Sequence, residues 1–89
     1  MQNPNEGASM RNLADQFINL ANALAKDGDR GTVGMAIRYA AARYNAFEAS
    51  LSAYDLRDDK DKILAMFSDD YKKMLLENID DHIQRAAGK

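Results

Sequence analysis

The segment from Met35 to Tyr54 most constrains the fold, because as one long helix it is apolar on two separate faces. At about 100° per residue, one stripe collects mostly large apolar residues, and a second stripe of mostly small ones lies roughly 150° away. The first consists of Val33, Ile37, Ala40, Tyr44, Phe47, Leu51 and Tyr54, and the second of Met35, Tyr39, Ala42, Ala46, Ala49 and Ala53. A helix that is apolar on two sides has to be covered on both sides, so we expect it at the centre of an assembly.

Two further amphipathic helices flank this segment, which predicts an all-α, up-down-up three-helix bundle with helices over about 10–26, 32–54 and 59–86. The first helix carries a single apolar stripe, made of Met10, Leu13, Ala14, Phe17, Leu20, Ala21 and Leu24. The small-residue stripe of the middle helix permits close approach of another backbone. That backbone belongs either to the first helix or to a second copy of the chain.

The expected helix ends rest on turn and capping residues. Residues 1–8 read as a flexible arm, and residues 9–87 as one helical domain. Ser9 and Thr32 fit as N-caps, and Asp58 or Asp59 fits before the third helix. Gly28 fits as a left-handed residue after the first helix. Ser68 could act as a second cap that splits the third helix. The apolar residues keep their helical spacing before and after Ser68, however, and this favours one continuous helix.

Composition excludes several classes of protein. The 89 residues contain no Cys, which removes disulfides, thiolate metal sites and thiol nucleophiles. Twelve Lys and Arg stand against 14 Asp and Glu, and no segment concentrates the positive charge that a nucleic-acid binder needs. No apolar run approaches the roughly 20 residues of a membrane span, and no signal peptide is visible, so we expect a cytoplasmic protein.

Three motifs that superficially suggest ligand sites are better explained structurally. The glycine-rich GDRGTVG stretch (28–34) precedes a helix, but it follows a helix and matches neither nucleotide fingerprint. Asp27-Gly28-Asp29 fails as a calcium loop at its later ligand positions. The acidic residues near His82 lack the Glu-x-x-His spacing of di-metal bundles. We therefore expect no metal, no cofactor and, with only one His in the chain, no catalytic constellation.

Polar residues on the apolar faces give the remaining candidate site. Arg43 lies between the two stripes of the middle helix, one turn from Tyr39. If the second and third helices pair antiparallel, Tyr71 comes level with Arg43, and His82 approaches Thr32. The predicted ligand-binding residues are therefore Tyr39, Arg43, Tyr71 and His82, with Arg43 as an anion anchor. The alternative is structural: Arg43 stacks on tyrosines with its guanidinium bonded to a carboxylate or a helix C-terminus, and His82 and Asn78 cap loop carbonyls.

Two sequence blocks resemble a family of small bacterial proteins of unknown function. The block Tyr39–Phe47 (YAAARYNAF) matches a mid-chain Tyr-Ala-Ala-Ala-Arg-aromatic-Asn-Ala-Phe signature, and Tyr71–Asp81 matches an element that begins Tyr-Lys-Lys-Met-Leu. The likeness covers roughly residues 10–84. It implies a cytoplasmic, all-helical bacterial protein and brings no activity, cofactor or ligand. It marks Tyr39, Arg43, Asn45 and Phe47 as the positions by which the family is recognised.

These observations predict a non-catalytic interaction module rather than an enzyme. The expected partner is a second copy or another protein helix, without nucleic acid or membrane. The predicted interface is the small-residue stripe at Ala42, Ala46, Ala49 and Ala53. The alternative function is binding of a small anionic ligand in a polar pocket around Arg43.

Overall fold

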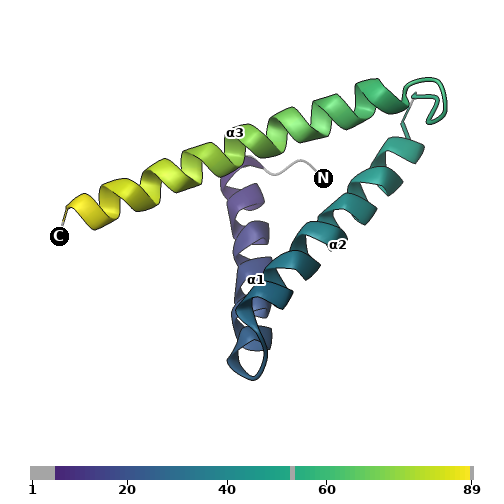
Figure 1. Cartoon of the computed structure of the whole chain (residues 1–89). Helices are drawn as coiled ribbons and strands as arrows, with labels where there is room; N and C mark the ends of the chain where they lie inside the picture. Colours follow the sequence, from purple (N-terminus) through teal and green to yellow (C-terminus); the bar gives the residue numbers. More distant parts are fainter. Residues whose placement is uncertain (1–5, 53, 89) are drawn as a thin grey trace. The chain divides into compact units, whose positions relative to one another are not determined.

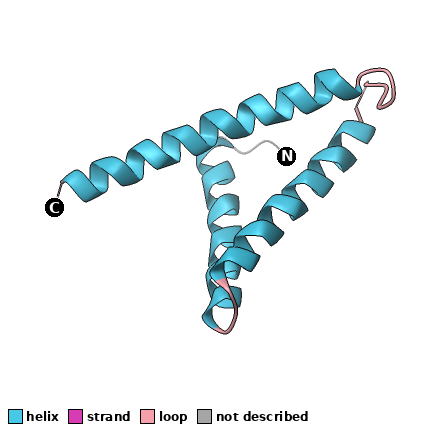
Figure 2. Cartoon of the chain, viewed as in Figure 1, coloured by secondary structure: helices cyan, strands magenta, loops and turns pink. Residues whose placement is uncertain are grey.

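The computed structural model describes residues 6–52 and 54–88 and contains three helices in chain order (Figures 1 and 2). They are α1 (Glu6–Lys26), α2 (Arg30–Ser50) and α3 (Lys60–Ala87). No strand occurs in these two described ranges, so the predicted all-α, three-helix fold is confirmed. The up-down-up packing of the helices and the single domain over 9–87 stay predictions. Of the predicted N-terminal arm, residues 1–5 lie outside the described residues.

The first helix begins one turn earlier than predicted. α1 starts at Glu6, so Ser9 lies inside the helix, and the prediction that Ser9 is its N-cap is wrong. The segment 6–9 contains no proline and includes Ala8, which favours a helical backbone. The C-terminal end falls at Lys26, as predicted, where the positive charge is favourable beside the helix carbonyls.

The connection after α1 reverses the chain without a left-handed residue. No glycine among the described residues has a positive φ, so the predicted left-handed role of Gly28 is wrong. A glycine is favoured there for a steric reason instead. A Cβ atom at position 28 would lie 3.1 Å from the carbonyl oxygen of Leu24, in the last turns of α1. A larger residue would therefore have to push the end of α1 away by a few tenths of an ångström.

Asp29, rather than the predicted Thr32, caps α2. The Asp29 backbone carbonyl accepts the first helical hydrogen bond from Val33 N at 3.0 Å. Its carboxylate accepts hydrogen bonds from Thr32 N at 3.2 Å and from the Thr32 hydroxyl at 2.8 Å. Gly31 N donates to the other carboxylate oxygen at 3.4 Å. These bonds satisfy backbone N–H groups that have no partner within the helix, so α2 begins two residues before the predicted start.

The second helix ends at Ser50, four residues before the predicted end at Tyr54. Leu51 N and Ser52 N donate to the carbonyls of Glu48 and Ala49, three residues back, at 3.1 and 3.2 Å. The Ser52 hydroxyl also donates to the Ala49 carbonyl, at 2.7 Å. Serine hydroxyls that compete for these carbonyls disfavour continued α-helix, and the apolar stripe alone did not reveal this.

The turn before α3 is closed by two aspartates. The Asp55 carboxylate accepts hydrogen bonds from Arg57 N and Asp58 N, both at 3.0 Å. Asp59 N donates to the Asp55 carbonyl at 2.7 Å, and the Asp59 carboxylate accepts from Asp55 N at 3.0 Å. Asp59 is the N-cap residue of α3, as one of the two predicted candidates, but its side chain reaches back to Asp55 instead of into the helix. α3 then runs unbroken through Ser68, as favoured by the apolar phase.

The chain divides into two compact units, Met1–Arg43 and Tyr44–Lys89. Among the residues whose side chains are described, only Ala49 and Ile63 are buried, at 3% and 9% exposure, and both belong to the second unit. In that unit the Tyr54 hydroxyl donates to Met66 Sδ at 3.4 Å, and Lys62 Nζ lies 6.0 Å from the centre of the Tyr54 ring. The described core is therefore confined to the region where the connection joins α3.

Candidate functional site

The Arg43 guanidinium lies over the ring of Tyr39, one turn earlier on α2. Its Cζ atom is 5.9 Å from the ring centre, within the range of a cation–π contact. Both side chains are exposed. In the described part of the chain, no carboxylate forms an ion pair with Arg43, because the ion pair found there joins Arg85 to Asp81. The tyrosine support expected for Arg43 is thus present, and its charge is available to solvent.

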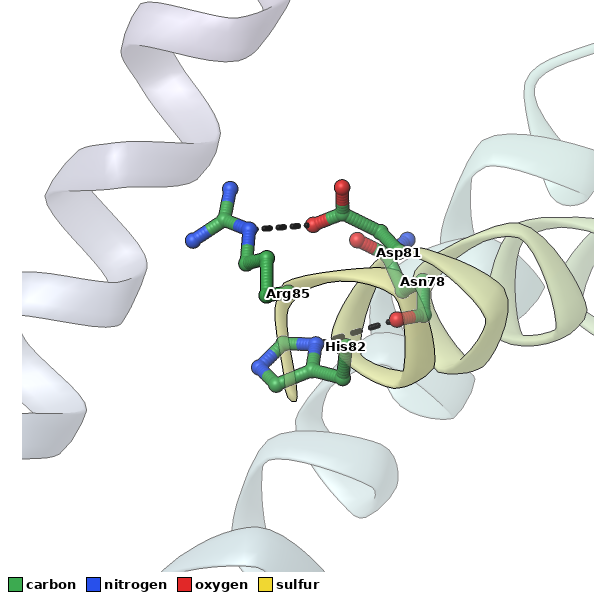
Figure 3. A network of polar contacts seen from close by, with 4 residues as sticks. All are labelled: Asn78, Asp81, His82 and Arg85. Carbon is green, nitrogen blue, oxygen red and sulfur yellow. Dashed lines mark hydrogen bonds and ion pairs between the residues drawn. The ribbon is translucent and has the colours of Figure 1, made fainter. Parts of the chain in front are cut away.

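Polar groups near the C-terminal end of α3 bond back to the helix itself (Figure 3). The Asn78 side-chain amide donates to the Met74 carbonyl at 2.8 Å. His82 Nδ1 lies 3.0 Å from the Asn78 carbonyl, and since a carbonyl only accepts, Nδ1 carries the proton. Nε2 is then left for an external partner. The Arg85 side chain bonds to Asp81 at 2.9 Å, on an exposed surface.

One face of α3 forms a shallow, open depression. It is lined by Leu75, Asn78, Ile79, His82, Ile83 and Ala86. The spacing of three and four residues places all six on one side of the helix. Asn78 and His82 direct their hydrogen bonds along the helix, so this face is apolar with two polar interruptions. It can pack against an apolar partner but encloses no small molecule.

The four predicted ligand-binding residues divide into two pairs. Tyr39 and Arg43 are in contact within the first unit, and Tyr71 and His82 lie on α3 in the second unit. Each of these four side chains is exposed. A pocket built from both pairs stays a prediction.

The start of α2 is occupied by the chain's own carboxylate. The backbone N–H groups of Gly31 and Thr32, which a bound anion needs, already donate to Asp29. The Thr32 hydroxyl bond, followed by the two backbone bonds, holds the pKa of the Asp29 carboxyl below its usual value of 3.8. The carboxylate therefore stays charged at neutral pH, and it repels a second anion from this helix terminus.

The predicted small-residue interface is available only in part. Ala42 and Ala46 are exposed on α2, whereas Ala49 is covered by its own chain. Ala53 lies outside the described residues. The polar edge of the same helix, formed by Arg38, Asn45 and Glu48, carries a hydrogen bond from the Asn45 amide to the Glu48 carboxylate at 2.7 Å.

Two relationships were missed from the sequence. The Asp29-x-x-Thr32 cap has a recognisable spacing, since a capping residue bonds to the third residue beyond it. The contact of Tyr54 with Met66 has no such signal, because it depends on how residues 51–59 fold back on α3.

Within residues 6–52 and 54–88, no group of three or more His, Asp or Glu residues is arranged to hold a metal ion. Over the same residues, no helix combines the length and apolarity needed to cross a bilayer.

Comparison with known proteins yields a family and no activity. No curated protein and no solved structure matches the chain. A family model does match it, over residues 10–83, which include all of α2 and most of α1 and α3. The expected membership in a family of unknown function is thereby confirmed, while the signature and the bacterial origin stay predictions. The chain belongs to the family described as protein of unknown function (DUF3144).

Proposed function

We propose that this protein is a non-catalytic helical interaction module that associates with a second copy of itself. One observation carries the proposal: large apolar side chains remain exposed along α1, α2 and α3, while Ala49 and Ile63 are the buried residues among the described side chains. Soluble proteins seldom leave contiguous apolar patches uncovered. Fully burying an exposed large apolar side chain is worth about 1.5–3 kcal/mol, and covering one that is only half exposed is worth about half of that. Association is therefore the favourable outcome for these faces.

The most direct experiment is the solution mass of the full chain, measured by size exclusion with light scattering over a concentration series. The proposal predicts twice the chain mass at high concentration. A constant monomer mass at every concentration would overturn it, because the apolar faces would then be covered within one chain.

A charge placed on the small-residue face of α2 tests whether that face takes part. Ala46→Glu introduces an unpaired carboxylate among small residues, and burying it is unfavourable. Ala41→Glu is the matched control, since Ala41 is exposed on the same helix beside Arg38 and Glu48, on the polar edge. If the face is an interface, Ala46→Glu halves the mass and Ala41→Glu does not. Equal masses for both variants would remove this face from the interface.

A second candidate function is recognition of a small anion, and the stacked pair Tyr39–Arg43 favours it. A guanidinium held over a ring without a carboxylate partner among the described residues presents its N–H donors for carboxylate or phosphate. Inorganic phosphate and acetate are suitable probes, by titration calorimetry. Arg43→Met should abolish binding and leave the helical circular dichroism unchanged. If the parent binds neither probe, or if Arg43→Met unfolds the protein, this candidate fails.

A further inference from the structure

The apolar stripe of α1 has the spacing of a short coiled-coil seam. Its large side chains follow at intervals of three and four residues, which corresponds to heptad positions a and d. The α1 seam consists of Met10, Leu13, Phe17, Leu20 and Leu24. Each of these side chains is between 56% and 69% exposed. Within the first unit, the seam is thus a continuous apolar ridge that is not covered.

Residues beside the α1 seam, rather than the seam itself, are the partly covered ones on this helix. Ala14, Ala21 and Ala25 are half-buried, and they lie along one flank. On α1 the small residues of this flank are therefore more covered than the large residues of the seam.

We infer that the α1 seam pairs with the α1 seam of a second copy of the chain, an inference that rests on the proposed self-association. Two identical seams with uncharged flanks meet without like-charge repulsion, whether they run parallel or antiparallel. The flanking e and g positions here are Ala14, Gln16, Ala21 and Ala23, and none carries a charge. The stripe on α3, by contrast, is interrupted by Asn78 and His82. The α1 seam is the better surface for a self-complementary contact.

The area of the α1 seam is sufficient for a reversible dimer. Covering one large apolar side chain removes about 100 Å² of apolar surface from water, which gives about 500 Å² per copy for the five residues. Gln16 and Ala23, the exposed flanking residues, raise this to between about 500 and 600 Å² per copy, near the lower end for specific interfaces. The seam is only about two heptads long, so its partners should separate on dilution.

A charge in the middle of the α1 seam tests the inference in the full chain. Phe17→Glu places a carboxylate at the central position of the seam. Asn19→Glu places the same group on the opposite face of the same helix, where the side chain is exposed, and it serves as the control. By light scattering, the parent and Asn19→Glu should show twice the chain mass, and Phe17→Glu the mass of one chain. If Phe17→Glu is still a dimer, the inference that the α1 seam forms the interface is wrong, but the proposed self-association stands. If the parent is a monomer, both the inference and the proposed self-association are wrong.

Cysteine cross-linking provides a second measurement that does not depend on the stability of the charged variant. The chain contains no Cys, so a single introduced thiol reports on one position. Residue 17 lies at the centre of the seam. In a symmetric dimer, residue 17 of one chain therefore lies near residue 17 of the other, whether the two helices run parallel or antiparallel. Under mild oxidation, Phe17→Cys should form a covalent dimer at least several-fold faster than Asn19→Cys. Equal rates for the two variants would contradict the inference.

Discussion

The Asp29 carboxylate accepts two hydrogen bonds from Thr32, one from its hydroxyl at 2.8 Å and one from its backbone N–H at 3.2 Å. This pair fixes where α2 begins. At the glycine-rich stretch 28–34, the N–H groups of Gly31 and Thr32 therefore donate to the protein's own carboxylate.

Removing this cap should destabilise α2. Asp29→Ala leaves the N–H groups of Gly31 and Thr32 without their side-chain acceptor, so the melting temperature should fall. Asp29→Asn retains a capping oxygen, and Asn ranks with Asp as an N-cap. We therefore expect Asp29→Asn to lie much closer to the parent in thermal unfolding followed by circular dichroism. Equal melting temperatures for the parent and Asp29→Ala would show that the cap contributes nothing.

The same cap predicts an acid-sensitive contribution to stability. The hydrogen bonds from Thr32 and Gly31 lower the pKa of Asp29 in the folded protein below 3.8, so the unfolded chain binds this proton more readily. The contribution is present above about pH 3.8 and is lost as the pH falls through the lower folded pKa. Asp29→Asn lacks this titration, so its stability should fall less steeply with acidification below pH 4. Parallel pH profiles for the two proteins would contradict the assignment.

Two glycines near the start of α2 should respond oppositely to alanine. Gly34 lies inside the helix, and an added Cβ would meet only the Arg38 guanidinium at 3.9 Å. Gly34→Ala should therefore stabilise the protein by about 0.5–1 kcal/mol. Gly28→Ala should not stabilise it, because its Cβ would crowd the Leu24 carbonyl oxygen at 3.1 Å. Urea unfolding of both variants checks the difference, and a destabilised Gly34→Ala variant would indicate close backbone packing at that position.

Ile63 should be the most sensitive aliphatic position at the start of α3. It is 9% exposed, whereas the neighbouring Leu64 is 62% exposed. Ile63→Ala should cost about 2–4 kcal/mol, because it removes buried methylene groups and leaves a cavity. Leu64→Ala, the control with a similar loss of volume, should cost clearly less. Similar losses for both variants in urea unfolding would mean that Ile63 is not part of a packed core.

The three helices could be predicted from sequence because each carries an apolar periodicity over several turns. One continuous third helix was predicted correctly despite Ser68, because the helical spacing of apolar residues continues on both sides of it. The helix ends were less predictable. The stripe of α2 continues to Tyr54, but the hydroxyl of Ser52 ends the helix sooner, and Asp29 rather than Thr32 begins it. Such ends are decided by individual hydrogen bonds, which periodicity does not register.

The sequence could predict the candidate site only where the contacting residues lie within one helical turn of each other. Tyr39 and Arg43 are one helical turn apart, so their contact follows from spacing alone. The bond from His82 to the Asn78 carbonyl is local in the same sense, but it joins His82 to its own helix, whereas the structural interpretation predicted a bond to a loop carbonyl. Any contact between Arg43 and Tyr71 depends on long-range packing. No spacing within one helix specifies that packing.

Thermal unfolding of the full chain over a wide range of protein concentration tests most directly whether association completes this fold. If two copies cover each other's apolar faces, folding is coupled to association, and the melting temperature should rise steadily with concentration. A melting temperature that is independent of concentration, together with a cooperative transition, would show that a single chain covers its own apolar faces and would contradict the proposed self-association.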